Sequence, residues 1–163
     1  VRNSVTQDGV GTIFVENNPV IKSIFDETEI DYKIPDDIDY SMWLKYTMNL
    51  FSNQVSAILN LTFGELKRNE AFITFAKKII AEVRQIAVKK GVKGLENLEK
   101  DALNFLSKMC DEGKTSMLQD VLAGRKTEVD IFAGEIIRLG KQFGLPTPYN
   151  QVLYDLINIM EQK

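Results

Sequence analysis

Residues 41–60 have the sequence SMWLKYTMNLFSNQVSAILN, and this stretch decides the fold. It contains neither proline nor glycine and is rich in good helix formers, so it predicts one helix of about five turns. When successive residues are placed about 100° apart around the helix axis, most polar residues gather in a sector roughly 100° wide. That sector holds Lys45, Asn49, Ser52, Asn53, Ser56 and Asn60. The remaining arc is almost entirely apolar, so the helix is predicted to be buried.

The polar strip on this helix differs from an ordinary solvated face, because it contains one cation, several amides and hydroxyls, and no acid. Buried amides and a buried ammonium need hydrogen-bonding partners. Two interpretations therefore stay open. The strip either lines a cleft for a small, oxygen-rich anion, with Lys45 as its only permanent charge, or forms a buried polar network between helices.

The composition is that of one ordinary globular domain, with 163 residues of which 44% are hydrophobic and 26% are charged. A net charge of -3 and the lack of a Lys/Arg run argue against a nucleic-acid partner. No apolar run approaches the roughly 20 residues that span a bilayer, so no membrane partner is predicted. Cys110 is the only cysteine, which excludes an intrachain disulfide and fits a reducing, cytoplasmic location.

The chain has no histidine, which excludes Ser-His and Cys-His mechanisms and most zinc sites. Cys110 lies beside acids and is a poor candidate for a nucleophile. Gly9 and Gly11 do not form a dinucleotide-binding fingerprint, because no third glycine follows at the required spacing. No metal site is predicted. Any redox or transfer chemistry would need a cofactor bound elsewhere.

The first 37 residues differ from the rest in being rich in β-branched residues. Turn signals at Asp8-Gly9 and Asn18-Pro19 predict one or two short strands, as in a hairpin. Residues 22–32 predict a short helix or strand, and residues 34–37 a linker. Asp39 or Ser41 is expected to cap the central helix.

Residues beyond 60 are predicted to be helical. Leu61–Arg68 is expected to be a break centred on Gly64, and Asn69 a helix cap. The predicted helices cover residues 70–90, 95–109, 116–122, 127–143 and 149–160. The sequence therefore predicts an all-α bundle of about six helices after a strand-rich arm.

Two residues at helix starts are candidates for function. Ser116, with Gln119 at capping-box spacing, is either a helix cap or a carboxylate contact at the positive end of a helix dipole. Glu128, at the first turn of its own helix, either interacts favourably with the dipole of that helix or serves as a functional hydrogen-bond acceptor at the helix mouth. Thr127 and Asp130 have the capping-box spacing in weaker form. Together with the polar strip, these groups suit an oxygenated acid.

Several motifs resemble one known family in order and spacing. They are Trp43-Leu44-Lys45 with Asn49, Phe63-Gly64-Glu65-Leu66, residues 115–120 (TSMLQD), residues 127–130 (TEVD) with Gly134, and Pro148-Tyr149-Asn150. They resemble the C-terminal domain of the ketopantoate reductase (2-dehydropantoate 2-reductase) family. The resemblance implies a 6-phosphogluconate dehydrogenase C-terminal-like helical domain over residues 38–163. It also implies that residues 1–37 are the last strands of a Rossmann domain and a linker.

The same resemblance implies an oxidoreductase that reduces ketopantoate to pantoate with NADPH, on the route to pantothenate and coenzyme A. Lys45 matches the catalytic general acid and Glu128 the active-site glutamate, while Asn49, Asn53 and Ser116 match substrate-binding residues. NADPH would be bound mainly by the Rossmann domain, which these residues lack, so the chain alone is expected to be inactive. A homodimer is also expected. The alternative is a non-catalytic helical dimerisation or interaction module.

Overall fold

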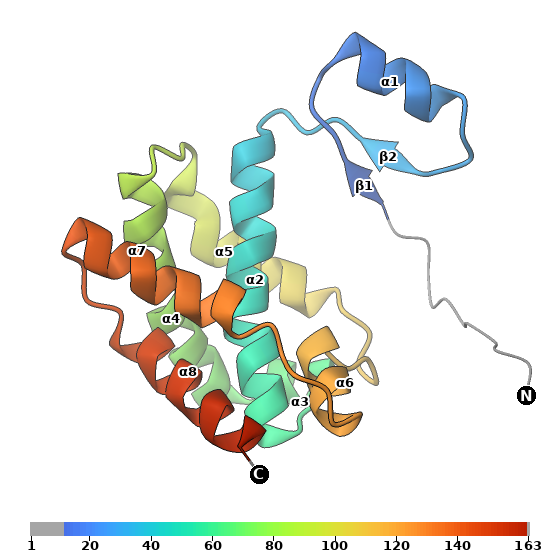
Figure 1. Ribbon diagram of the computed structural model, residues 1–163. Helices are drawn as coiled ribbons and strands as arrows, with labels where there is room; N and C mark the ends of the chain where they lie inside the picture. Colours follow the sequence, from blue (N-terminus) through green and yellow to red (C-terminus); the bar gives the residue numbers. More distant parts are fainter. Residues whose placement is uncertain (1–11, 163) are drawn as a thin grey trace, which may run out of the picture. The chain divides into compact units, whose positions relative to one another are not determined.

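The computed structural model describes residues 12–162, and the chain divides between Ser41 and Met42 into two compact units (Figure 1). The first unit contains β1 (Ile13–Phe14), α1 (Pro19–Asp26) and β2 (Tyr32–Lys33). The second contains all of the helices that follow the central one. Among the described residues, no helix is both long and apolar enough to cross a bilayer.

The two strands of the first unit are parallel, with Ile13 opposite Tyr32 and Phe14 opposite Lys33. A hairpin that turns at Asn18-Pro19 is therefore wrong, because parallel neighbours need a crossover connection, and α1 supplies it. The Asn18-Pro19 pair starts this helix instead of forming a turn. The Asn18 side chain accepts a hydrogen bond from the Val20 N–H at 2.9 Å, and proline is well suited to the first helical position. The predicted Asp8-Gly9 turn lies outside the described residues.

The central helix α2 (Ile38–Leu59) begins before its predicted start. The cap is Asp37 and not Asp39 or Ser41, because the Asp37 carboxylate accepts from the Tyr40 N–H at 2.9 Å. The second half of α2 is buried on its apolar and polar sides alike. Its buried residues are Thr47, Met48, Leu50, Phe51, Ser52, Asn53, Gln54, Val55, Ser56 and Ala57.

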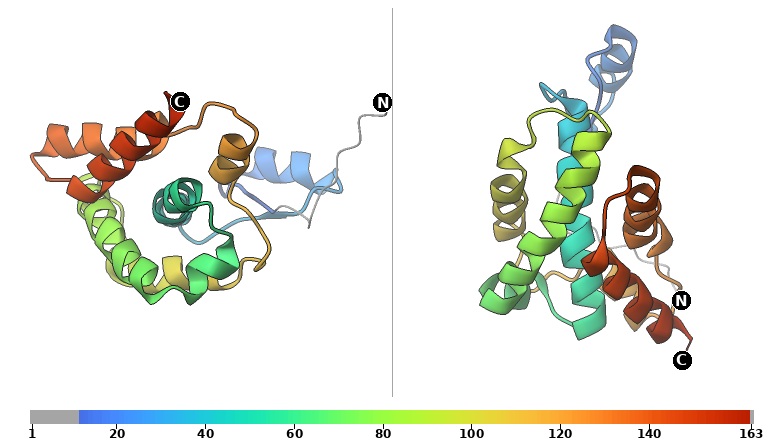
Figure 2. Two further views of the ribbon diagram at one scale, coloured as in Figure 1. Left: turned by 90° about the horizontal axis from the view of Figure 1, so that it is seen from below. Right: turned by 90° about the vertical axis from the view of Figure 1, so that its left-hand side faces the viewer.

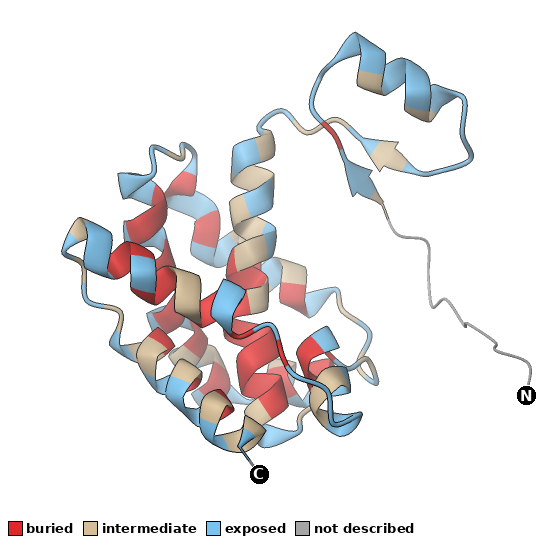
Figure 3. Cartoon of the chain, in the orientation of Figure 1, coloured by how far each residue is buried: buried red, intermediate tan, exposed pale blue. Residues whose placement is uncertain are grey.

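The remaining elements of the second unit surround α2, which is seen end-on at the centre of the left view in Figure 2. They are α3 (Phe63–Arg68), α4 (Glu70–Lys89), η1 (Leu95–Asn97), α5 (Leu98–Ser107), α6 (Ser116–Leu122), η2 (Asp130–Gly134), α7 (Glu135–Phe143) and α8 (Pro148–Glu161). Figure 3 shows buried stretches, coloured red, along these helices. The all-α class predicted for this part of the chain is confirmed.

The predicted break at Leu61–Arg68 is mostly helical. Thr62 and Glu65 form a capping box at the start of α3: the Thr62 hydroxyl accepts from the Glu65 N–H, and the Glu65 carboxylate accepts from the Thr62 N–H. The actual break is short and contains Asn60, whose φ is +54°. Gly64 is buried within α3, where an added Cβ would lie 2.8 Å from both the Cβ and the carbonyl oxygen of Asp111. The glycine therefore permits close packing and does not interrupt the helix.

Candidate functional site

The polar face of α2 runs from the surface into the core. Lys45, Asn49 and Asn53 are spaced by four residues and share one helix face. Lys45 is exposed, Asn49 is half-buried, and Asn53 is only 4% exposed. This face therefore presents a charge at one end and a buried amide at the other.

The start of α6 meets the buried end of this face. The Asn53 side-chain amide donates to the Ser116 hydroxyl at 3.5 Å, across 63 residues of sequence. Beside this contact, the Thr115 hydroxyl donates to the Ser56 hydroxyl at 3.1 Å in a buried setting. Two polar contacts thus join α2 to α6, and they bring together Asn53 and Ser116, two of the five predicted site residues.

The cap of α6 is Thr115 and not Ser116, because the Thr115 hydroxyl accepts from the Leu118 N–H at 3.2 Å. The proposed capping box is therefore wrong, and Gln119 instead donates to the Lys114 carbonyl at 3.1 Å. Ser116 occupies the first helical position and is exposed. Its hydroxyl is not used in capping and can contact a ligand.

Glu128 lies just before η2, in an exposed position. Its backbone carbonyl accepts from the Ile131 N–H at 3.1 Å. Within the described part of the chain, its carboxylate makes no hydrogen bond or ion pair with the other four candidates. The second predicted capping box is absent as well: the Thr127 N–H donates to the Glu161 carboxylate at 2.6 Å, and the Asp130 carboxylate accepts from the Tyr154 hydroxyl at 2.9 Å.

Tyr46 connects α2 to the segment that follows Glu128. Its hydroxyl lies 2.9 Å from the carbonyl oxygens of Ile131 and Phe132 and donates to them. Its ring stacks on Phe132, with centroids 6.1 Å apart. Burial, and to a smaller degree the charge of Glu135, raise the pKa of Tyr46 well above its ordinary value of 10.0.

Replacing Tyr46 with phenylalanine should make stability less sensitive to alkaline pH. The raised pKa means that the folded state keeps a proton which the unfolded state releases near pH 10. The stabilisation from Tyr46 is therefore complete below pH 10 and is lost as the pH rises through the folded pKa. Urea unfolding at a series of pH values should show a shallower decline above pH 10 in the variant. Equal slopes for the two proteins would contradict this account.

The Lys45 ammonium lies 6.0 Å from the centroid of the Phe105 ring, on α5. Phe105 lies in the predicted helix 95–109, and no local sequence signal links it to Lys45. Among residues 12–162, no group of three His, Cys, Asp or Glu side chains could hold a metal ion.

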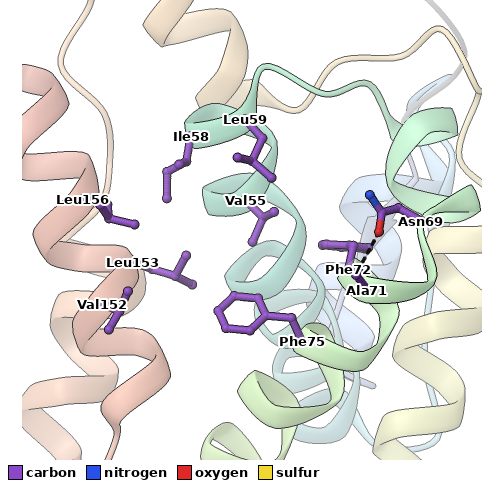
Figure 4. A pocket seen from close by; sticks show the side chains of 10 residues that line it. All are labelled: Val55, Ile58, Leu59, Asn69, Ala71, Phe72, Phe75, Val152, Leu153 and Leu156. Carbon is purple, nitrogen blue, oxygen red and sulfur yellow. Dashed lines mark hydrogen bonds between the residues drawn. The ribbon is translucent and has the colours of Figure 1, made fainter.

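A separate pocket of about 310 Å³ lies at the other end of α2, between α4 and α8 (Figure 4). Its walls are apolar except for Asn69, whose side-chain oxygen caps α4. The lining residues are Val55, Ile58, Leu59, Asn69, Ala71, Phe72, Phe75, Val152, Leu153 and Leu156. Such walls suit an apolar group and not a carboxylic acid, so this pocket is distinct from the polar site.

Comparison with known proteins gives a family match over most of the chain. The family described as “Ketopantoate reductase PanE/ApbA C terminal” matches residues 37–161. A 2-dehydropantoate 2-reductase of Archaeoglobus fulgidus is 31% identical over 128 residues, which are 77% of this chain and 42% of the relative. The chain spans about half the length of the curated relatives it matches.

Solved structures agree with this match. A PanE/ApbA family ketopantoate reductase from Ralstonia eutropha aligns with a TM-score of 0.83 and 27% identity, over 94% of this chain and 52% of that one. A D-mandelate dehydrogenase in complex with NADH and anilino(oxo)acetate aligns with a TM-score of 0.86 and 23% identity. This alignment covers 97% of this chain and 69% of the dehydrogenase chain, and it shows that the two share a fold.

Proposed function

Because the chain belongs to the ketopantoate reductase family, we propose that it is the substrate-binding and catalytic part of a reductase that converts 2-dehydropantoate to pantoate with NADPH. This reaction would serve the synthesis of pantothenate and coenzyme A. The observation that carries the proposal is the polar face of α2. It leads from the exposed Lys45 to Asn53, which donates to Ser116 at the start of α6.

We also propose that residues 1–37 are the end of a nucleotide-binding domain with its linker, and that residues 38–163 are the substrate domain. The parallel pair β1 and β2 with its crossover helix α1 supports this division, since such units build nucleotide-binding sheets. The described residues contain no glycine-rich turn that could hold a pyrophosphate, so NADPH would be bound mainly by the rest of the enzyme. When bound, NADPH supplies the hydride.

The five candidates would divide the work on a 2-oxo acid. As negative charge develops on the carbonyl oxygen, the Lys45 ammonium stabilises that charge and donates a proton to it. The half-buried Asn49 amide donates to a substrate oxygen. The Ser116 hydroxyl donates to the substrate carboxylate, close to the positive end of α6, while Asn53 orients that hydroxyl.

Glu128 needs a different role, because a carboxylate repels an anionic substrate. We propose that it accepts a hydrogen bond from the substrate hydroxyl or pairs with Lys45 once the substrate is bound. The contacts of Tyr46 with Ile131 and Phe132 hold the segment after Glu128 against α2 and would limit its movement.

A homodimer in the cytoplasm completes the proposal. Exposed apolar side chains on α8 and at the end of α2 offer a surface for self-association. They are Leu59, Val152, Leu156 and Ile159, with exposed fractions of 57%, 53%, 40% and 59%. The single cysteine, Cys110, is free, and a reducing compartment fits it.

The function can be tested in a fusion protein that joins this chain to the part of the Archaeoglobus fulgidus relative that does not align with it. This fusion is called the assembled enzyme below. Oxidation of NADPH should depend on added 2-dehydropantoate and should follow saturation kinetics. The proposal fails if the fusion folds and binds NADPH but none of the branched 2-oxo acids supplied as substrates leads to NADPH oxidation. That outcome would favour the alternative of a non-catalytic interaction module.

In the assembled enzyme, replacing Ser116 with alanine should raise KM by about 10-fold or more, with little change in kcat. Loss of a hydrogen bond to a charged group has about this effect, and the contact is made in the ground and transition states alike. Steady-state kinetics would measure both constants. Replacement of the exposed Ser107 on α5 with alanine is the matched control. An unchanged KM in the Ser116 variant would contradict the carboxylate contact.

A further inference from the structure

We propose that Phe105 is a positioning residue for Lys45: its ring holds the Lys45 ammonium by a cation–π contact before the substrate arrives. The Lys45 Nζ lies 6.0 Å from the centroid of this ring, at the limit of the range for such contacts. This inference rests on the proposed function in one respect: it takes Lys45 to be the catalytic general acid. The contact itself is a property of the chain alone.

Lys45 needs such a partner because it is exposed on a long, flexible side chain. Four other lysines of the described chain pair with carboxylates: Lys22 with Asp26, Lys67 with Asp111, Lys77 with Glu99 and Lys126 with Asp130. The Lys45 ammonium has no carboxylate partner within residues 12–162. The Phe105 ring is the only group there in cation–π contact with it.

An aromatic partner suits a proton donor that must meet an anion. Before the substrate binds, a carboxylate partner would neutralise the ammonium and would repel the incoming 2-oxo acid. The face of a phenyl ring attracts the ammonium through its quadrupole but carries no net charge. The ring engages only the side of the ammonium that faces it. The N–H groups of Lys45 that point away from the ring therefore remain available to donate to the substrate oxygen.

The position of Phe105 on α5 explains how its ring is held in place. Its neighbours on this helix, Ala102 and Leu106, are 0% and 1% exposed and anchor α5 in the core. Phe105 itself is half-buried. Phe105 is thus carried by a helix that is anchored in the core, and its half-buried ring remains accessible to the Lys45 ammonium. The contact therefore restrains the flexible Lys45 side chain of α2 against the Phe105 ring of the anchored α5.

The contact can be tested in this chain without any cofactor. In a sample with ¹³C-labelled lysine, the Lys45 Hε resonances should be shifted upfield by the ring current of Phe105. The variant Phe105→Leu keeps an apolar side chain but removes the ring, so these resonances should move downfield. Phe105→Tyr should keep the upfield shift. Lys78, whose ammonium lies 5.4 Å from the Tyr149 ring, is the internal control and should not move.

In the assembled enzyme, Phe105→Leu should lower kcat about 3- to 10-fold, as expected from the loss of one cation–π contact, and should change KM less. Phe105→Tyr should restore kcat. Unchanged Lys45 resonances in Phe105→Leu would overturn the contact, and an unchanged kcat in that variant would overturn its positioning role. Normal turnover of Lys45→Ala would instead overturn the proposed function, and the resonance test would still decide whether the contact exists.

Discussion

Replacing Lys45 with alanine in the assembled enzyme should lower kcat by about 10²- to 10⁴-fold, the usual contribution of a positioned general acid. Hydride addition to a ketone leaves an alkoxide, and the ammonium of Lys45 is the cation on the polar face of α2 that can stabilise and protonate it. NADPH affinity should change little, because the nucleotide is proposed to be held mainly outside this chain. Single-turnover kinetics and a separate NADPH titration would measure the two effects.

Two further variants sharpen this test. Lys45→Arg keeps a positive charge but is a poor proton donor, since arginine remains protonated at ordinary pH. It should recover part of the loss if electrostatic stabilisation dominates. Lys78→Ala removes another exposed lysine that lies over an aromatic ring and should leave kcat unchanged. Near-normal turnover of Lys45→Ala would remove the catalytic assignment and leave the polar strip as a packing network.

Replacing Glu82 with alanine should lower the free energy of unfolding by about 3–5 kcal/mol, because it removes three hydrogen bonds to a buried carboxylate and leaves their N–H donors without this acceptor. Glu82 lies on α4 and is 5% exposed. Its carboxylate accepts from the Tyr149 N–H at 2.8 Å, and from the Asn150 N–H and side-chain amide at 3.1 and 2.7 Å. Thr147, at the cap position of α8, makes no side-chain capping bond. Glu82 therefore caps α8 from a neighbouring helix.

Urea denaturation of the chain would measure this loss. Glu82→Gln should also be destabilising, because an amide N–H would face a backbone N–H of α8. Glu99→Ala is the matched control: it removes an exposed carboxylate of α5 that pairs with Lys77 at 3.3 Å, and should cost at most about 1 kcal/mol. A loss for Glu82→Ala no larger than that of the control would contradict the capping role.

Local signals were enough to predict the long helices of the second unit, although α3 was taken for a break. The apolar arc of residues 41–60 predicted the buried α2, and Asn69 caps α4 as predicted, through its contact with the Phe72 N–H. Gly144 ends α7 with a φ of +66°, and α8 begins at Pro148. These signals work because helix periodicity, caps and breakers act within a few residues of one another.

Local patterns made the site residues candidates, and the resemblance gave each of them a role. Lys45, Asn49 and Asn53 share one helix face by spacing alone, and a sequence pattern can show this. Ser116 and Glu128 belong to other segments, and no local rule could tell whether they lie beside α2. The structure brings Ser116 to Asn53, and the functional roles of all five residues stay predictions.

Some errors concerned local signals that were missed, such as the Thr62–Glu65 capping box and the Asp37 cap, and others arose where distant segments determined the local structure. Thr115 replaced Ser116 as a cap while also bonding to Ser56 of α2, and Gly64 permits the approach of Asp111 and does not break a helix. Glu82 and Phe105 carry no sequence signal for their roles, because their partners lie 67 and 60 positions away. Periodicity tells which face of a helix is buried, whereas packing determines which residue of another helix meets it. Capping of α8 by Glu82 and the contact of Phe105 with Lys45 therefore depend on how the helices pack around α2.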